Sequence, residues 1–257
     1  MANPILIYEV CDEIAFITMN RPEKLNALNG ELSMALKAAW IRFQNDDEAK
    51  VAVFKGAGKS FCAGADQTPG ELDPNVPFQS HEGYPPNGMG LYKPVVAAVR
   101  GFAYGAGYAL AVRGSDITIC SDNAKIGFPE ARVGIPLPPI SYLPYLPFKM
   151  SLELMLLGWN GGRIMPAERA YQLGLVNAVV PDDQLEAEAV RWAELFKRIP
   201  PLYIKSVKAG HYKSAYSASR LQELEYIEYV WPQMISEDRK EAKAAFQERR
   251  EPKFTGR

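Results

Sequence analysis

KPVVAAVRGFAYGAG, residues 93–107, is the stretch that decides the fold class. Within it, VVAAVRG is an apolar run that ends in glycine, and the turn that follows is built from glycine and alanine. Such a run, bounded by turn residues, is typical of a strand buried on both faces of a sheet. VAVFKG at 51–56 and FCAGAD at 61–66 repeat this order of strand, glycine and small residues. The two copies indicate a core built from repeated strand–helix units.

Strands and helices alternate on both sides of these copies. Short apolar stretches predict further strands, the first two of them paired as a hairpin, at 5–10, 14–20, 115–122 and 176–180. Apolar residues at helical spacing predict helices over 30–45, 167–176, 183–198, 202–214, 218–231 and 238–249. Asn29 and Ser236 stand where the first and last of these helices need an N-cap. Residues 67–93 are rich in Pro, Gly and Asn, which predicts a long functional loop. The expected fold class is α/β, with a largely helical C-terminal part.

The composition is that of an ordinary globular protein. The 257 residues are 47% hydrophobic and 23% charged, and their net charge is −1. A chain near neutrality lacks the field that attracts nucleic acid or an anionic membrane, although local basic clusters suit a phosphorylated small molecule. No apolar run approaches the roughly 18 residues of a membrane helix. The first residues lack the basic and apolar regions of a signal peptide. We therefore expect a cytoplasmic protein without nucleic-acid or membrane partners.

Cysteine and histidine are scarce. The three cysteines, Cys11, Cys62 and Cys120, are odd in number and lack CxxC spacing, which favours free thiols in a reducing compartment. Neither His81 nor His211 has a second His or Cys at metal-ligand spacing, so no metal site is expected. Both histidines fit solvated or surface positions better than catalytic ones, and no GxSxG motif indicates a hydrolytic triad.

The two small-residue turns are the first candidates for chemistry. Alanine and glycine leave the backbone N–H groups of a turn accessible, because no bulky side chain shields them. Two such turns can each aim one N–H at a single oxygen and so form an oxyanion hole. The candidate donors are Ala65, in AGAD, and Ala106, in YGAG. The alternative interpretation is close packing of one backbone against another.

The second turn also contains the start of a dinucleotide fingerprint. Gly105 and Gly107 give GxG after a strand, and Asp122 lies at the end of the next strand. Leu110 occupies the position of the third glycine, and the intervening helix is very short. We therefore do not favour nucleotide binding of this kind.

Glu130 is the best single candidate for a general acid/base. It follows Phe128 and Pro129, and an apolar wall raises the pKa of a carboxyl group towards neutrality. The alternative is a surface carboxylate paired with Arg132. Asp66 directly follows Ala65, and a structural role as a cap is favoured over catalysis.

These motifs together resemble the crotonase superfamily, the enoyl-CoA hydratases and isomerases, over essentially the whole chain. The resemblance rests on six stretches: NRPEKLNALN at 20–29, SFCAGAD at 60–66, KPVVAAVRGFAYGAG at 93–107, FPEARVGI at 128–135, AERAYQLGLVNAVVP at 167–181 and SEDRKEAKAAFQERREPKF at 236–254. It implies a spiral of ββα repeats over residues 1–195. It further implies a helical region over 196–257 that assembles trimers, or hexamers made of two trimers.

The resemblance also implies a coenzyme A thioester substrate and no separate cofactor. In this family two backbone N–H groups hold the thioester oxygen, and matching the motifs places them on Ala65 and Ala106. The same matching implies contacts with the coenzyme A moiety from Lys24, Ala27, Ala65, Asp66, Gln67, Thr68, Ala106, Lys253 and Phe254. The last two match tail positions that, in some relatives, reach the nucleotide of a neighbouring subunit.

The departures from the family pattern bear on the reaction. Family hydratases usually carry two catalytic glutamates; Glu130 matches the second, but Ala109 stands in place of the first. Ala106 replaces the usual middle glycine, and Pro138 stands where some isomerases place an aspartate. We expect an enoyl-CoA hydratase/isomerase with Glu130 as its only acid/base. The single carboxyl group modestly favours isomerisation over hydration. The alternatives are a superfamily hydrolase of a cyclic β-keto acyl-CoA or a thioester, and a non-catalytic acyl-CoA-binding protein.

Overall fold

The computed structural model describes residues 4–68, 84–135, 146–160, 163–215 and 236–253. The chain forms two compact units: unit 1 comprises Met1–Ile126 and Pro166–His211, and unit 2 comprises Gly127–Met165 and Tyr212–Arg257. The division into residues 1–195 and 196–257 stays a prediction. No helix in the described ranges is both long and apolar enough to cross a membrane.

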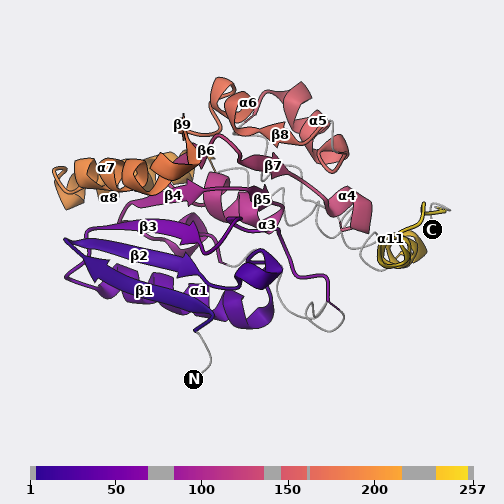
Figure 1. The fold of residues 1–257 in the computed structure, drawn as a ribbon. Helices are drawn as coiled ribbons and strands as arrows, with labels where there is room; N and C mark the ends of the chain where they lie inside the picture. The colour runs from indigo at the N-terminus through magenta and orange to yellow at the C-terminus, as the bar shows by residue number, and fades with distance from the viewer. Residues whose placement is uncertain (1–3, 69–83, 136–145, 161–162, 216–235, 254–257) are drawn as a thin grey trace. The chain divides into compact units, whose positions relative to one another are not determined.

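A six-stranded sheet forms the centre of unit 1, in the order β1-β2-β3-β4-β6-β9 (Figure 1). The first two strands form the expected antiparallel hairpin, and the remaining neighbours are parallel. The strands are β1 (Leu6–Cys11), β2 (Ile14–Met19), β3 (Val51–Gly56), β4 (Val95–Val99), β6 (Ile117–Ser121) and β9 (Ala178–Val180). All five residues of β4 are buried, as the apolar run in the sequence predicts.

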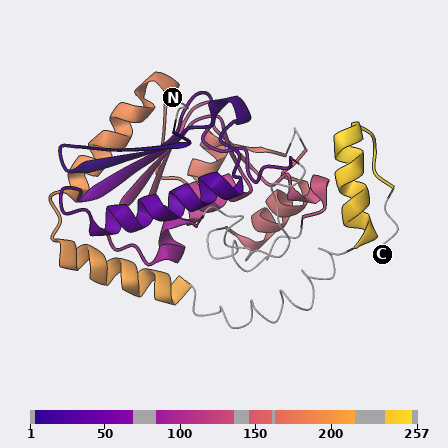
Figure 2. The same ribbon diagram turned by 90° about the horizontal axis from the view of Figure 1, so that it is seen from below.

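Helices cover both faces of this sheet (Figure 2). α7 (Leu185–Phe196) packs its buried residues against Val53 and its neighbours. Side chains of adjacent strand residues point to opposite faces, so Phe54 faces the other way. There it meets Trp40 of α1 (Gly30–Asn45) edge to face, with ring centroids 5.0 Å apart. The predicted helix and its cap are confirmed, because the Asn29 side chain accepts a hydrogen bond from the Leu32 amide at 2.9 Å.

A short strand and a short helix follow β4. β5 (Phe102–Tyr104) leads into α3 (Ala106–Tyr108), which continues as the π-helical turn η3 (Ala109–Arg113). Side chains donate hydrogen bonds to two carbonyls of this turn. Buried Thr118 donates to the Ala111 carbonyl at 2.7 Å, and Ser115 donates to the Leu110 carbonyl at 3.0 Å.

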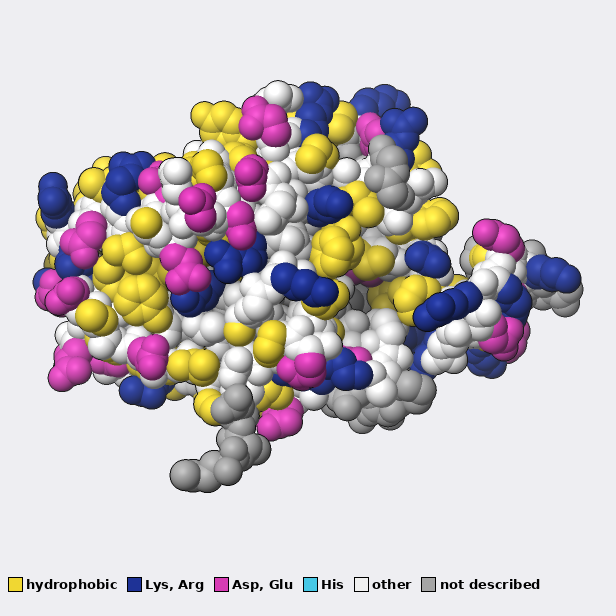
Figure 3. Space-filling model, in the orientation of Figure 1, with side chains coloured by type: hydrophobic (Ala, Val, Ile, Leu, Met, Phe, Trp, Pro, Cys, Tyr) yellow, Lys and Arg dark blue, Asp and Glu magenta, His cyan; other side chains and the backbone are white. Residues whose placement is uncertain are grey.

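The remaining elements are brief. β5 also belongs to a three-stranded sheet in the order β5-β7-β8, with β7 (Lys125–Gly127) and β8 (Met165–Pro166). The other helices are η1 (Pro22–Lys24), η2 (Pro86–Met89), α6 (Ala167–Gln172), η6 (Asp182–Gln184) and α8 (Pro201–Ala215). On the face shown in Figure 3, basic and acidic side chains are interspersed, in keeping with the net charge of −1.

Unit 2 contains three described helices: α4 (Glu130–Val133), α5 (Phe148–Leu157) and α11 (Glu237–Glu248). The cap of α11 is confirmed, since the Ser236 hydroxyl accepts a hydrogen bond from the Arg239 amide at 3.1 Å. α5 is a helix that the sequence analysis does not predict. The helix expected over 218–231, together with Pro138 and His81, lies outside the described residues.

Candidate active site

The first small-residue turn runs beside the segment that precedes α1. Leu28 donates its amide to the Gly64 carbonyl at 2.8 Å, and its carbonyl accepts the Asp66 amide at 2.8 Å. Successive amides of an extended chain point to opposite sides, so the Ala65 amide between them points away from Leu28. Within the described part of the chain, this amide has no recorded acceptor.

The second turn begins at Gly105, which has φ 49° and ψ −108°, a conformation that glycine adopts without strain. Ala106 is the first residue of α3, where a helix leaves its amides without internal partners. Among the described residues, the Ala106 amide likewise has no recorded acceptor. Its side chain is 8% exposed.

The two turns lie in backbone contact within unit 1. Cys62 donates its amide to the Phe102 carbonyl at 2.8 Å and accepts the Tyr104 amide at 3.0 Å. Glycine is required on both sides of this junction. A Cβ at Gly107 would lie 2.5 Å from the Cys62 carbonyl oxygen, and one at Gly64 would lie 3.1 Å from the Tyr104 carbonyl oxygen. The same two turns therefore combine close backbone packing, at Gly64 and Gly107, with amides that have no acceptor among the described residues, at Ala65 and Ala106.

Asp66 is held in a buried ion pair. Its carboxylate lies 3.0 Å from the Arg21 guanidinium and accepts hydrogen bonds from the Thr68 amide at 3.0 Å and the Thr68 hydroxyl at 2.6 Å. Burial acts to raise the pKa of Asp66, but the hydrogen bonds and the Arg21 charge outweigh it, so the pKa lies below its ordinary value. This carboxylate organises the turn, as its expected structural role requires.

Two residues that organise the first turn, Arg21 and Asn26, are not indicated by the sequence pattern. Asn26 is fully buried at φ 55°, a left-handed conformation that asparagine tolerates. Its side chain donates to the carbonyls of Ala57 at 2.9 Å and Ser60 at 2.8 Å, and it accepts the Arg21 amide at 2.9 Å. The two carbonyls that accept from Asn26 belong to residues more than thirty positions away along the chain, so local pattern does not reveal these contacts.

The expected coenzyme A contacts near this turn differ in exposure. Lys24 and Thr68 are exposed, whereas Ala27 and Gln67 are half-buried. The Ala27 carbonyl accepts a hydrogen bond from the Arg21 guanidinium, and the Gln67 side chain donates to the Ala65 carbonyl at 3.1 Å. Gln67 therefore orients the carbonyl of Ala65, and Arg21 orients the segment that precedes α1.

The charge of Asp66 has a measurable consequence for stability. Asp66→Asn should lower the free energy of unfolding by about 2 kcal/mol at neutral pH, because the half-buried Arg21 loses its counterion. In the wild type the ion pair stabilises fully above the ordinary pKa of 3.8, and its contribution is lost as the pH falls through the lowered folded pKa. Urea unfolding at neutral pH and near pH 3 measures both effects. The difference between the two proteins should shrink in acid.

Asp122→Asn is the matched control for this substitution, because Asp122 is exposed. Its effect should stay within about 0.5 kcal/mol. An Asp66→Asn variant as stable as the control at neutral pH would contradict the assigned role of the ion pair.

Glu130 is the first residue of α4 in unit 2, and it is 9% exposed. Its carbonyl accepts the amides of Gly134 and Ile135, the latter at 2.9 Å. The surface pair with Arg132 is not formed; the Arg132 guanidinium lies 5.1 Å from the centre of the Phe246 ring instead. Ala109, in unit 1, is fully buried within η3.

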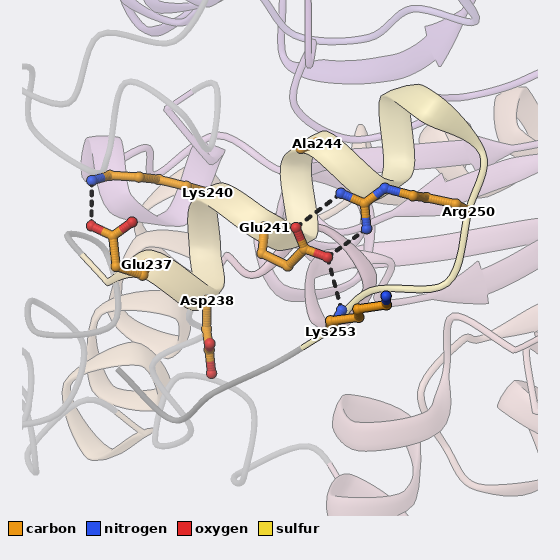
Figure 4. Close-up of a pocket in the computed structure, with 7 residues that line it drawn as sticks. All are labelled: Glu237, Asp238, Lys240, Glu241, Ala244, Arg250 and Lys253. Carbon is orange, nitrogen blue, oxygen red and sulfur yellow. Dashed lines mark hydrogen bonds and ion pairs between the residues drawn. The ribbon is translucent and has the colours of Figure 1, made fainter.

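Lys253 lines an open cavity of about 590 Å³ on α11 (Figure 4). Its walls carry acidic and basic residues in equal number: Glu237, Asp238, Lys240, Glu241, Ala244, Arg250 and Lys253. The Glu241 carboxylate accepts hydrogen bonds from the Arg250 guanidinium and, at 2.8 Å, from the Lys253 amide. The hydrogen bond from Arg250 lowers the pKa of Glu241 to about 2. Because the acidic and basic charges of the walls balance, the cavity attracts an anion only weakly. Phe254 lies outside the described residues.

Comparison with known proteins places these features in a family. Residues 9–257 match the family model described as Enoyl-CoA hydratase/isomerase. An (E)-benzylidenesuccinyl-CoA hydratase of Thauera aromatica is 34% identical over 96% of this chain and 98% of its own length. A carnitinyl-CoA dehydratase of Salmonella heidelberg (strain SL476) is 31% identical over 94% of each chain. The crystal structure of a carnitinyl-CoA hydratase from Mycobacterium avium has a TM-score of 0.85 and 32% identity over the full length of both chains.

These matches confirm the α/β fold and the resemblance that the six motifs carry. The chain belongs to the enoyl-CoA hydratase/isomerase family of enzymes, within the crotonase superfamily.

Proposed function

We propose that the chain acts on the acyl group of a coenzyme A thioester through an enolate-like intermediate. The Ala65 and Ala106 amides stabilise the negative charge on the thioester oxygen, and Glu130 is the acid/base. The observation that carries this proposal is the pair of adjoining turns, each with an alanine amide that has no acceptor among the described residues. Loss of one such donor costs about 3–4 kcal/mol in other enzymes, which is the contribution expected of each amide.

One carboxyl group suffices for the proton transfers of either family reaction. In hydration, Glu130 takes a proton from water as the oxygen bonds to the β-carbon, and the same carboxyl returns a proton to the α-carbon. In isomerisation, it takes a proton from the α-carbon of a 3-enoyl thioester and returns one to the γ-carbon. The enolate forms in both, so the same two amides serve both.

Reversible hydration is the first choice and double-bond isomerisation the second. The names of the relatives, a benzylidenesuccinyl-CoA hydratase and a carnitinyl-CoA dehydratase, favour hydration. The buried Ala109, which stands in place of the first family glutamate, favours isomerisation, because family hydratases usually carry two catalytic glutamates.

The coenzyme A moiety is part of the substrate, and the reaction needs no separate cofactor. We propose that Lys24, Ala27, Asp66, Gln67 and Thr68 lie along it on the side of the first turn. The exposed Lys24 supplies positive charge there, and Asp66 keeps the turn in place through Arg21. Lys253 and Phe254 are proposed contacts for the nucleotide part. The proposed assembly is a homotrimer, or a hexamer of two trimers.

Product analysis with a panel of thioesters tests the proposed function. The panel holds crotonyl-CoA, (E)-benzylidenesuccinyl-CoA, a 3-enoyl-CoA and a cyclic β-keto acyl-CoA. A hydroxyacyl-CoA from either 2-enoyl substrate supports hydration, and a 2-enoyl-CoA from the 3-enoyl substrate supports isomerisation. Release of free coenzyme A or cleavage of the ring would overturn the proposal in favour of a hydrolase. Tight binding without turnover of any member would overturn it in favour of an acyl-CoA-binding protein.

A further inference from the structure

The turn that carries Glu130 is too short to hold its own shape. α4 is a single helical turn of four residues, and a helix of this length does not persist in water without tertiary contacts. The Glu130 carbonyl accepts the amides of Gly134 and Ile135, so the backbone of Glu130 moves with the end of the turn. What packs against residues 132–134 therefore fixes where Glu130 lies.

α11 packs against the end of this turn within unit 2. Gly134 has φ 68°, and a Cβ built on it would lie 3.0 Å from the Ala242 Cβ and 3.0 Å from the Arg239 Cα. Ala242 is 1% exposed. Ala242 is therefore buried in close contact with the end of the turn, and a larger side chain at position 242 would press against it.

A second contact ties the same two elements together. The Arg132 guanidinium lies 5.1 Å from the centre of the Phe246 ring, within the range of a cation–π interaction. Arg239, Ala242 and Phe246 are three and four positions apart, so they share one face of α11. This face contacts α4 at Arg132 and Gly134, on both sides of Val133.

We propose that α11 is the support that positions Glu130, and that Ala242 is the positioning residue that sets the spacing between α11 and α4. The inference rests on the proposed function, in which Glu130 moves the proton. A larger residue at position 242 pushes the end of α4 away from α11, and the Glu130 backbone shifts with it. A misplacement of about 1 Å costs on the order of 100-fold in rate where a catalytic group must meet its proton.

Ala242→Leu in the full-length chain tests this positioning role. We expect kcat to fall at least about ten-fold with KM within about two-fold, because the change displaces the carboxyl group and leaves the proposed thioester contacts in unit 1 in place. Ala242→Gly is the conservative variant. It keeps the close approach but weakens the helix, so Tm should fall while kcat stays near the wild type. A general structural role of Ala242 predicts instead that kcat follows Tm in both variants.

Gln247→Leu is the control, because it adds an apolar side chain at an exposed position of the same helix and should leave kcat unchanged. If Ala242→Leu does not fold, Ala242→Val makes the smaller insertion and should give an intermediate loss of kcat. Wild-type kcat in a folded Ala242→Leu or Ala242→Val variant would overturn the inference. Glu130→Gln separates this failure from that of the proposed function: if Glu130→Gln is inactive while Ala242→Leu is fully active, only the positioning role fails.

Discussion

Glu130→Gln is expected to lower turnover by about two orders of magnitude or more, with little change in acyl-CoA affinity. Glutamine has the shape of glutamate but neither takes nor returns a proton, so the substitution removes the chemistry and keeps the packing. Keeping the side-chain shape is important because Glu130 is 9% exposed and is the first residue of α4, so a smaller side chain would also disturb the packing. Single-turnover kinetics on the thioester that the panel identifies, together with calorimetric binding of the same thioester, measure the two quantities separately.

Glu168→Gln is the matched control, because Glu168 is an exposed glutamate in the first turn of α6. It should have wild-type turnover and affinity. Thermal unfolding of both variants shows whether the fold survives. A Glu130→Gln protein that turns over at the wild-type rate would remove Glu130 from the mechanism. A loss of affinity equal to the loss of turnover would make it a binding residue instead.

The elements that the sequence predicts correctly are those whose burial repeats at one period. α1 buries Leu32, Leu36, Ala39, Trp40 and Phe43 at helical spacing and begins at an asparagine cap, so both its existence and its start are predictable. β4 is buried at every residue, and its continuous apolar run predicts that. In both cases the local pattern and the tertiary environment agree.

The sequence does not predict α5, because its apolar residues do not coincide with the positions that are buried. Its apolar residues Phe148, Leu152 and Leu156 are exposed, at 61%, 38% and 62%, while the polar Ser151 is buried beside the apolar Leu154. A helix that is apolar on its exposed face has no amphipathic period to detect. The preceding stretch, rich in proline, further resembles a loop in sequence.

In the candidate site, too, some features can be predicted from the local sequence and others cannot. The turns that hold Ala65 and Ala106 are predictable because small residues follow a strand there, while the role of the two amides stays a prediction. Arg21 and Asn26 are not predictable, because they act through partners distant in the chain: Arg21 pairs with Asp66, 45 positions further on. Such contacts exist only once the strands have brought the turns together.

Gly107→Ala should abolish most of the activity by separating the two turns. The added Cβ would lie 2.5 Å from the Cys62 carbonyl oxygen and 3.0 Å from the Cys62 Cβ, and a backbone carbonyl cannot rotate away as a flexible side chain can. The turn that carries Ala106 must therefore move away from the one that carries Ala65. We expect kcat to fall by about 10²–10³-fold, the cost of losing one oxyanion donor, and the free energy of unfolding to fall by about 1–3 kcal/mol.

Gly30→Ala separates the effect of crowding from that of adding a methyl group. Gly30 is the first residue of α1, and no described atom lies within 4 Å of a Cβ placed there. This variant should keep wild-type kcat and gain up to about 1 kcal/mol of stability, because alanine loses less backbone entropy than glycine on folding. Steady-state kinetics and urea unfolding on both variants measure the contrast. A folded Gly107→Ala enzyme with wild-type kcat would mean that the spacing of the two turns does not matter, and the paired-amide mechanism would fail with it.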